Sequence, residues 1–333
     1  MKKNVRLVDI AEKLDLTKVS VSKALRDHPD ISAKTRKKVK KVAREMGYRP
    51  NLLARSLASQ KSQTIGVIIP KMANSFFASV VEGIYSFANE SDYDVVLGIS
   101  LEDEKLEKKH IESMLNMRVD GLLVSITEQT KDPERFEIVR DMGIDLVFFD
   151  RGFSNAGFTY IKVDDKKSAK AGLKFLLDKG YKEIAHLAGY ESIEIGSERK
   201  TGYLEALKEA SIELPENMII EGGYNEKDGY LGFKKLLERY GKPSALFAVT
   251  YPVGLGALEF MKEKGMDPNE ITILSFGSSE FNQHLINPFI CIEQPRNQLG
   301  QKAFEQIIKE MNSDMKSFPE TIELSAKVNE YKL

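Results

Sequence analysis

The stretch that most constrains this chain is LVDIAEKLDLTKVSVSKALR, residues 7–26. Apolar residues recur at i, i+3, i+4 and i+7 from Leu7 to Leu14, which predicts a short amphipathic helix. The pattern breaks at residues 15–16, and Thr17 is a suitable N-cap for a second helix. One face of this second helix is apolar. The other face carries Lys18, Val19, Ser22 and Lys23.

An outward face with two cations, a hydroxyl and a small apolar group suits a DNA groove. Lysine donates to guanine or phosphate there, and valine meets a thymine methyl group. The two helices therefore predict a helix-turn-helix. Residues 1–61 hold 17 Lys+Arg against 6 Asp+Glu, while the remainder holds 32 against 44. A basic head on an acidic body favours nucleic-acid binding, and the alternative is a solvated basic tail.

A third helix is predicted from the N-cap Ser32 to about Met46, with Gly47 as its C-cap. These helices form a head, residues 1–48, whose small core makes it only marginally stable alone. Residues 49–61 then form a hinge and linker. Its short helical segment, about 52–58, is too short to persist in water, so a partner copy or DNA must order it.

Four segments of this region closely resemble the LacI/GalR family of bacterial transcription regulators: VDIAEKL (8–14), TKVSVSK (17–23), SAKTRKKV (32–39) and YRPNLLARSLA (48–58). The resemblance implies that Lys18, Val19 and Lys23 read bases in the major groove. It implies phosphate contacts for Thr17, Ser22, Thr35 and Asn51.

The resemblance also implies minor-groove contacts for Ala54 and Leu57, and Arg55 in the same segment is a further DNA-binding candidate. A paired Leu57 would unstack the central base step and bend the duplex. The alternative for Leu57 is a helix–helix contact within a dimer. Lys23 stands where the family usually has arginine. Its ammonium lacks the planar, two-pronged guanidinium group of arginine, so we expect a looser base preference at this position.

From Thr64 the chain alternates short β-rich runs with helical patterns, which predicts an α/β body of two parallel sheets. The resemblance implies a periplasmic-binding-protein-like fold of two α/β subdomains. The first would comprise residues 62–162 and 293–322. The second would comprise residues 163–292 and 323–333.

Ligands in open parallel sheets bind beyond the carboxyl ends of the strands. Phe76 and Phe77 follow the first strand and offer aromatic faces to a sugar ring or a base, although Phe77 could instead belong to the core. Asp150 ends the fourth strand and could accept hydroxyl hydrogen bonds. Arg199 is the strongest candidate, since its planar fork binds hydroxyl pairs, carboxylates or phosphates. The alternative for Arg199 is a surface pair with a nearby Glu.

Asp164 and its neighbour Asp165 lie at the expected subdomain crossing, as cleft residues or as helix caps. Thr250 and Gln294 complete the effector-binding candidates, and Gln294 matches a position where the family contacts effector or a crossover strand. The family usually has Asn-Asp or Thr-Asp near Thr250 and an Asp after TILSF, where this chain has GSSE, 277–280. These departures weaken the case for a neutral hexose and favour an anionic ligand or a larger oligosaccharide.

Other features of the sequence limit the possible functions. The one cysteine, Cys291, excludes an internal disulfide and indicates a reducing compartment. The sequence offers no signal peptide and no run of 18 apolar residues, so we expect a cytoplasmic protein with no membrane partner. We expect no cofactor, metal site or catalytic residue, because no phosphate-binding, dinucleotide, nucleophile-elbow or metal motif occurs.

The sequence therefore predicts a homodimeric regulator, most simply a repressor, that binds a palindromic operator and responds to a sugar, a sugar phosphate or another metabolite. No leucine heptad follows the body to hold a tetramer. Two alternatives remain at this stage. One is the same DNA-binding role under the control of a partner protein, and the other is a solute-binding protein of the same body fold.

Overall fold

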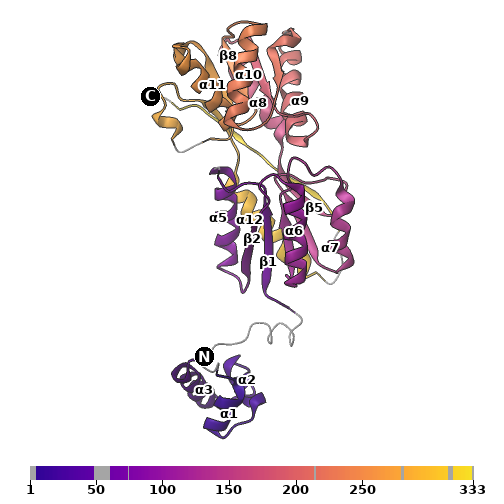
Figure 1. The fold of residues 1–333 in the computed structure, drawn as a ribbon, viewed down its shortest axis with the longest axis vertical. Helices are drawn as coiled ribbons and strands as arrows, with labels where there is room; N and C mark the ends of the chain where they lie inside the picture. The colour runs from indigo at the N-terminus through magenta and orange to yellow at the C-terminus, as the bar shows by residue number, and fades with distance from the viewer. Residues whose placement is uncertain are drawn as a thin grey trace. The chain divides into compact units, whose positions relative to one another are not determined.

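The computed structural model describes residues 5–48, 61–73, 75–213, 215–278, 281–313 and 318–331 (Figure 1). The chain forms two compact units, Met1–Ser62 and Gln63–Leu333, which are called the head and the body below. The predicted hinge helix lies outside the described residues, with its candidates Asn51, Ala54, Arg55 and Leu57.

The described part of the head is built from α1 (Leu7–Leu14), α2 (Lys18–Leu25) and α3 (Ala33–Met46). Thr17 caps α2 by accepting from the Ser20 N–H, and Ser32 caps α3 by accepting from the Thr35 N–H. Gly47 ends α3 with φ +73°, a conformation that favours glycine. The three helices enclose a small apolar core of Ile10, Ala11, Val21, Ala24, Val39 and Ala43. The predicted helix-turn-helix is confirmed.

The first subdomain of the body is a parallel sheet in the order β11-β5-β4-β3-β1-β2. Its strands are β1 (Thr64–Ile69), β2 (Asp94–Ile99), β3 (Gly121–Val124), β4 (Asp145–Phe149), β5 (Thr159–Val163) and β11 (Thr321–Leu324). Apolar residues of α5 (Ser75–Ala88) and α12 (Arg296–Met311) cover one face. The other face is covered by α6 (Glu104–Asn116) and by the short helices η1 (Pro133–Phe136) and α7 (Glu137–Asp141).

The second subdomain repeats this plan in the order β12-β10-β9-β8-β6-β7, except that its edge strand β12 runs antiparallel to β10. Its strands are β6 (Ile184–Ala188), β7 (Ile219–Glu221), β8 (Ala245–Ala248), β9 (Thr272–Phe276), β10 (Ile290–Glu293) and β12 (Lys327–Asn329). One face packs against α8 (Asp165–Asp178) and α9 (Glu194–Glu209). The other packs against α10 (Glu226–Arg239) and α11 (Tyr251–Glu263). The predicted two-sheet parallel α/β class is confirmed.

The chain passes between the two sheets after β5, after β10 and between β11 and β12. The tail after α12 forms β11 in the first sheet and then β12, the last strand, in the second sheet. Glu323 and Leu324 pair with Lys162 and Val163 of β5 in the first sheet. Without β11 one side of β5 would leave its backbone groups unpaired, which explains why the tail stays with the first sheet this far.

None of the helices in the described ranges combines the length and the hydrophobicity that crossing a bilayer requires.

Candidate nucleic-acid interface and ligand cleft

The outward face of α2 matches the surface that the sequence assigns to DNA. Thr17 and Lys18 are exposed, and Val19 is 65% exposed although Val21 of the same helix is fully buried. An apolar side chain held in water on a helix of only eight residues gains nothing from the head's own core. This exposure is what a thymine-methyl contact needs.

Two of the three hydroxyl candidates for phosphate contact lie at helix N-termini. Thr17 is the N-cap of α2, and Thr35 lies in the first turn of α3, where its Oγ1 is 2.9 Å from Ser32 Oγ. Backbone N–H groups at a helix N-terminus favour an anion. Ser22 and Lys23 are half-buried, and Lys23 Nζ lies 2.7 Å from Asp30 Oδ2.

In the body, Asp150 directly follows β4 and is buried, with φ +59°. The Tyr160 hydroxyl donates to the Asp150 carbonyl oxygen at 2.8 Å and so fixes this turn. Burial raises the pKa of the Asp150 carboxyl to about 7, although Arg151 and Arg199 oppose the shift. Asp150 is therefore a carboxyl group that is partly protonated near neutral pH.

Arg199 is buried in α9, which removes the alternative of a surface pair with Glu. Its Nε donates to Asp165 Oδ1 at 2.8 Å, and its Nη1 donates to the Val249 carbonyl oxygen at 2.7 Å. The guanidinium carbon lies 3.7 Å from the centre of the Phe276 ring. The fork is thus already occupied by a carboxylate, and burial raises the pKa of Asp165. Asp164, the neighbour, caps α8 by accepting from the Lys167 N–H.

The remaining effector candidates lie in different settings. Phe77 packs into the apolar core of the first subdomain, as its alternative reading proposed, whereas Phe76 beside it is half-buried. Thr250 caps α11, and its hydroxyl donates to the Tyr224 carbonyl oxygen at 2.8 Å. Gln294 lies beside Gly277 at the end of β9. Their contact with a ligand stays a prediction.

A pocket of about 380 Å³ lies between the loops that follow β3 and β4 and the segment before α9. Its walls include Thr127, Glu128, Arg151, Phe153, Tyr160 and Glu194. The seven effector candidates are absent from its lining. The pocket nevertheless adjoins one of them, Asp150, because Arg151 Nε in its wall lies 4.0 Å from Asp150 Oδ2.

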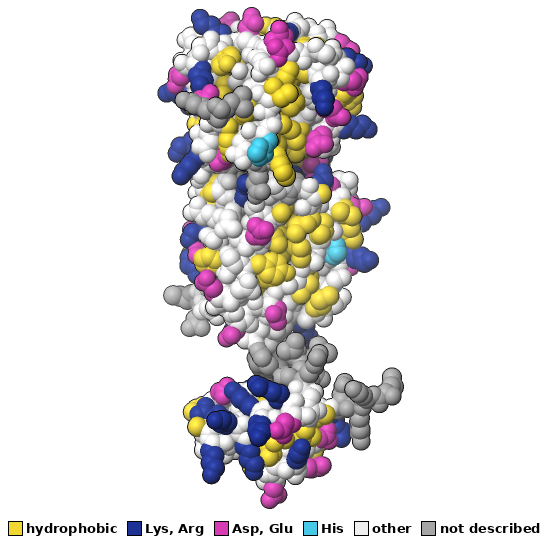
Figure 2. All heavy atoms as spheres, turned by 90° about the vertical axis from the view of Figure 1, so that its left-hand side faces the viewer, with side chains coloured by type: hydrophobic (Ala, Val, Ile, Leu, Met, Phe, Trp, Pro, Cys, Tyr) yellow, Lys and Arg dark blue, Asp and Glu magenta, His cyan; other side chains and the backbone are white. Residues whose placement is uncertain are grey.

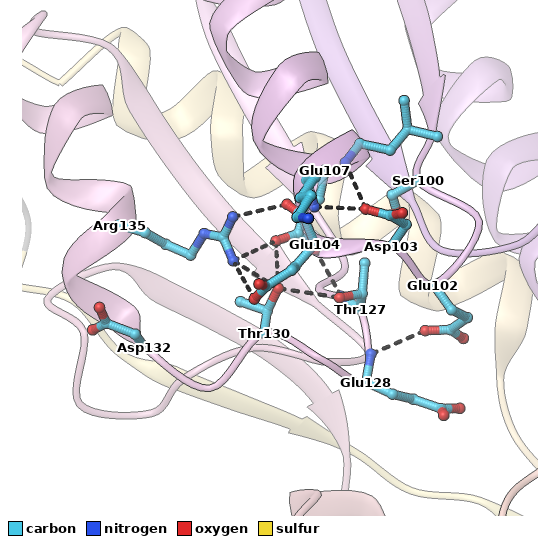
Figure 3. Close-up of polar contacts among 12 residues, drawn as sticks. Ser100, Glu102, Asp103, Glu104, Glu107, Thr127, Glu128, Thr130, Asp132 and Arg135 are labelled. Atoms are coloured by element: carbon cyan, nitrogen blue, oxygen red, sulfur yellow. Dashed lines mark hydrogen bonds and ion pairs between the residues drawn. The ribbon is translucent and has the colours of Figure 1, made fainter.

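A buried carboxylate fixes the loop that forms one wall of this pocket (Figure 3). Glu107 of α6 is fully buried and accepts from the Thr127 N–H and from the Thr130 hydroxyl, each at 2.7 Å. Arg135 closes the group by donating to Thr130 Oγ1 at 3.1 Å and to the Glu104 carbonyl oxygen at 2.9 Å. Figure 3 shows these side chains converging from α6, from the loop after β3 and from η1.

Arg151 and Lys162 form three further ion pairs near this pocket. Arg151 Nη1 lies 3.0 Å from Glu102 Oε1, and its guanidinium carbon lies 5.7 Å from the Tyr224 ring centre in the second subdomain. Lys162 of β5 is buried and lies 2.7 Å from both Glu194 and Glu198 of α9. The Arg151–Tyr224 contact and the two Lys162 ion pairs join the two subdomains, whereas the Arg151–Glu102 pair lies within the first.

Sequence reasoning missed Arg151, Glu102, Glu107 and Lys162. The strand-end rule that selected Asp150 could have found Arg151, the next residue, and Glu102, which follows β2. Lys162 stands inside a buried strand, where a lysine is rare unless paired. Nothing in the sequence distinguishes Glu107, because it is one of several acidic residues in a highly charged helix.

Comparison with known proteins identifies the family. Residues 6–51 match the family described as "Bacterial regulatory proteins, lacI family", and residues 62–325 match "Periplasmic binding proteins and sugar binding domain of LacI family". This chain belongs to the LacI family. It is a DNA-binding transcriptional regulator of that family, whose members are regulators rather than enzymes.

Its LacI-family relatives cover nearly the whole chain. Catabolite control protein A of Priestia megaterium is 30% identical over 93% of this chain and 94% of its own. The HTH-type transcriptional repressor PurR of Vibrio atlanticus is 28% identical over 95% and 97%. The solved lac repressor dimer, bound to operator and the anti-inducer ONPF, has the same fold with a TM-score of 0.86, at 23% identity over 98% of both chains.

Proposed function

We propose that this LacI-family regulator represses transcription as a homodimer on a two-fold symmetric operator and that a small molecule in the body cleft changes its affinity for DNA. The main support for DNA binding is the outward face of α2, where Val19 is exposed. Thr17, Lys18, Ser22 and Lys23 surround it on the same face. Lys18, Val19 and Lys23 would contact bases, and Thr17, Ser22 and Thr35 would contact phosphates.

The hinge residues complete the proposed interface. Asn51 would contact a phosphate, while Ala54, Arg55 and Leu57 would enter or flank the minor groove. Insertion of Leu57 from both protomers would kink the duplex, which is least costly at a pyrimidine–purine step. We therefore expect such a step at the operator centre.

An apolar surface of the first subdomain supports the homodimer. Figure 2 shows hydrophobic side chains gathered over α5 and β2. Tyr85 is exposed, and Val95, Val96 and Leu97 of the edge strand β2 are only half-buried. An apolar edge strand is a liability unless another surface covers it. A second copy of the chain would cover it and would bring one head to each half-site.

For the effector we propose an uncharged, polyhydroxylated molecule larger than a monosaccharide. The cations Arg151 and Arg199 are already matched by Glu102 and Asp165, and Glu128 lies 3.8 Å from Arg151 as a second carboxylate partner. A sugar phosphate would meet no free cation among these groups, whereas hydroxyls can donate to carboxylates and accept from the arginines. The adjoining pocket with Phe153 and Tyr160 extends the space beyond one ring.

Relatives include proteins named ribose operon repressor and a regulator solved as a CelR–cellobiose complex. These names support genes of carbohydrate metabolism as the proposed targets. We place the action of the protein in the cytoplasm, where bacterial operators lie, and assign it no catalytic role.

The test is selection of binding sites from random duplexes by the full-length protein, repeated with cellobiose, ribose and ribose 5-phosphate. We expect one palindromic site, bound by a dimer, whose recovery changes with an uncharged sugar. Failure to enrich any two-fold symmetric site would contradict the proposed function. A response to the phosphate ester alone would contradict the proposed effector class but leave the DNA-binding role intact.

A further inference from the structure

One acidic side chain lies against a lysine that we assign to base reading. Lys23 Nζ of α2 is 2.7 Å from Asp30 Oδ2, and the Asp30 side chain is 57% exposed. Lys23 holds the pKa of the Asp30 carboxyl below its usual range. The Asp30 carboxylate is therefore ionised, and it stands on the same surface as the exposed end of Lys23.

The turn between α2 and α3 fixes the position of this carboxylate. The Asp30 N–H donates to His28 Nδ1 at 3.3 Å, and the Ile31 N–H donates to the His28 carbonyl oxygen at 3.1 Å. Ile31 packs against the core of the head. Asp30 is thus presented by an ordered turn that is anchored on one side by the core and on the other by Ser32, the N-cap of α3.

A carboxylate on a DNA-binding surface has an electrostatic cost, because it repels phosphate in a head that otherwise attracts it. Its presence beside a base-reading lysine is explained if it accepts a hydrogen bond from a base. Aspartate accepts from the amino group of cytosine N4, and lysine donates to guanine O6 and N7. Lys23 is a donor and Asp30 an acceptor, and they lie side by side. They therefore match the guanine O6 acceptor and the cytosine N4 donor, which are neighbours in the major groove of a G·C pair.

We propose that Lys23 and Asp30 form one donor–acceptor unit that reads a G·C base pair, with guanine facing Lys23, and that Asp30 is therefore a specificity-determining residue. The inference rests on the proposed function, which places α2 in the major groove. The reversed C·G pair puts an amino group against the ammonium and a carbonyl oxygen against the carboxylate, so both contacts become repulsive. A T·A pair keeps O4 for Lys23 and the adenine amino group for Asp30 but lacks the guanine N7 acceptor.

The same loop supplies a matched control. Asp27 also pairs with a lysine, Lys40, at 2.5 Å, and this pair likewise lowers the Asp27 pKa. Lys40 belongs to α3 and is not among the base-reading candidates. Asp27→Asn and Asp30→Asn therefore remove the same charge from the same loop and break the same kind of ion pair, yet only Asp30→Asn touches the proposed unit.

The experiment compares the full-length wild type, Asp30→Asn and Asp27→Asn by binding-site selection. Fluorescence anisotropy then measures Kd for the selected duplex, for the duplex with one symmetric G·C pair reversed, and for a random duplex. We expect the wild type to discriminate against the reversed pair by about tenfold or more. Asp30→Asn should lose most of this discrimination and bind the random duplex more tightly, because a repulsive charge is gone. Asp27→Asn should keep the discrimination.

A second variant tests the unit from its other side. Lys23→Gln should alter preference at the same base pair as Asp30→Asn. The proposal is overturned if Asp30→Asn retains the wild-type preference at every position, or if the two variants act on different base pairs. If the wild type selects a palindrome and Asp30→Asn selects the same one with the same preferences, only this inference is refuted. A wild type without any selected site would remove the proposed function as well.

Discussion

Arg199 and Asp165 are joined through a single carboxylate oxygen: Nε and Nη2 of the arginine lie 2.8 Å and 2.7 Å from Asp165 Oδ1. Both side chains are almost completely buried. The pair ties α9 to α8, and the bond from Arg199 to the Val249 carbonyl oxygen extends the link to the end of β8. The residue that the sequence singled out for ligand binding therefore also holds the second subdomain together.

Replacing Arg199 by Met should destabilise the body by about 3–5 kcal/mol, because Asp165 would be left buried without its counter-charge. Unfolding in urea, followed by circular dichroism since the chain has no tryptophan, measures the loss. Adding Asp165→Asn to Arg199→Met should recover part of it, because the unpaired charge is removed. A cost below about 1 kcal/mol would show that the pair is not energetically coupled to the fold.

The Asp150→Asn variant should gain stability over the wild type as pH rises. The pKa of Asp150 is about 7 in the folded protein against an ordinary 3.8, so between these values the native state retains a proton that the unfolded chain has released. Wild-type stability therefore falls as pH rises through this window and levels off above it. Asparagine tolerates the positive φ at this position.

The difference in unfolding free energy between Asp150→Asn and wild type should grow by up to about 4 kcal/mol from about pH 4 to about pH 8. Urea titrations at several pH values measure it. A difference that stays constant across this range would mean that Asp150 ionises in the folded protein as it does in water.

Glu107→Ala should cost about 1–3 kcal/mol, because the Thr127 N–H and the Thr130 hydroxyl would lose their buried acceptor. The loop after β3 should also become more sensitive to limited proteolysis. Glu112 of the same helix is half-exposed and lies 4.0 Å from Lys108, so Glu112→Ala provides the control, with an expected effect within about 0.5 kcal/mol. Equal effects of the two variants would contradict the positioning role of Glu107.

Lys18→Ala should weaken specific DNA binding by roughly 1–3 kcal/mol if Lys18 contacts a base. Competition binding on the selected site and on random duplex separates the two kinds of contact. An equal loss on both duplexes would mean that Lys18 contacts a phosphate and carries no sequence information.

Leu57→Ala should reduce the bend of the bound operator, because alanine is too small to hold the central base step open. Gel-phasing measurements with the wild-type and variant proteins report the bend directly. An unchanged bend together with a weakened dimer would assign Leu57 to helix–helix packing instead.

The sequence predicts the elements well where the signal is local. The caps Thr17 and Ser32 and the glycine at 47 set the ends of the head helices through their own hydrogen bonds and backbone conformation. The strands of the two sheets are equally easy to predict, because a parallel strand that is covered on both faces needs a continuous apolar stretch.

The side-chain partners could not be predicted in this way. Arg199 meets an aspartate 34 positions away, and Lys162 meets glutamates 32 and 36 positions away, so each pair depends on how helices dock rather than on spacing within one element. Phe77 illustrates the same difficulty at closer range. Adjacent aromatic residues at a strand end are both consistent with a ligand face, and only the packing of α5 decides which one enters the core.

The tail strands have a consequence for how the protein is made. Both sheets of the body receive a strand from the segment after residue 320, and α12, which covers the first sheet, comes just before it. The head, in contrast, has all its described helices within the first 46 residues. A ribosome therefore exposes the complete three-helix head long before either half of the sensor can close. Polypeptides cut short during synthesis or by proteases would carry the head without a body that can respond to ligand or pair with a second copy.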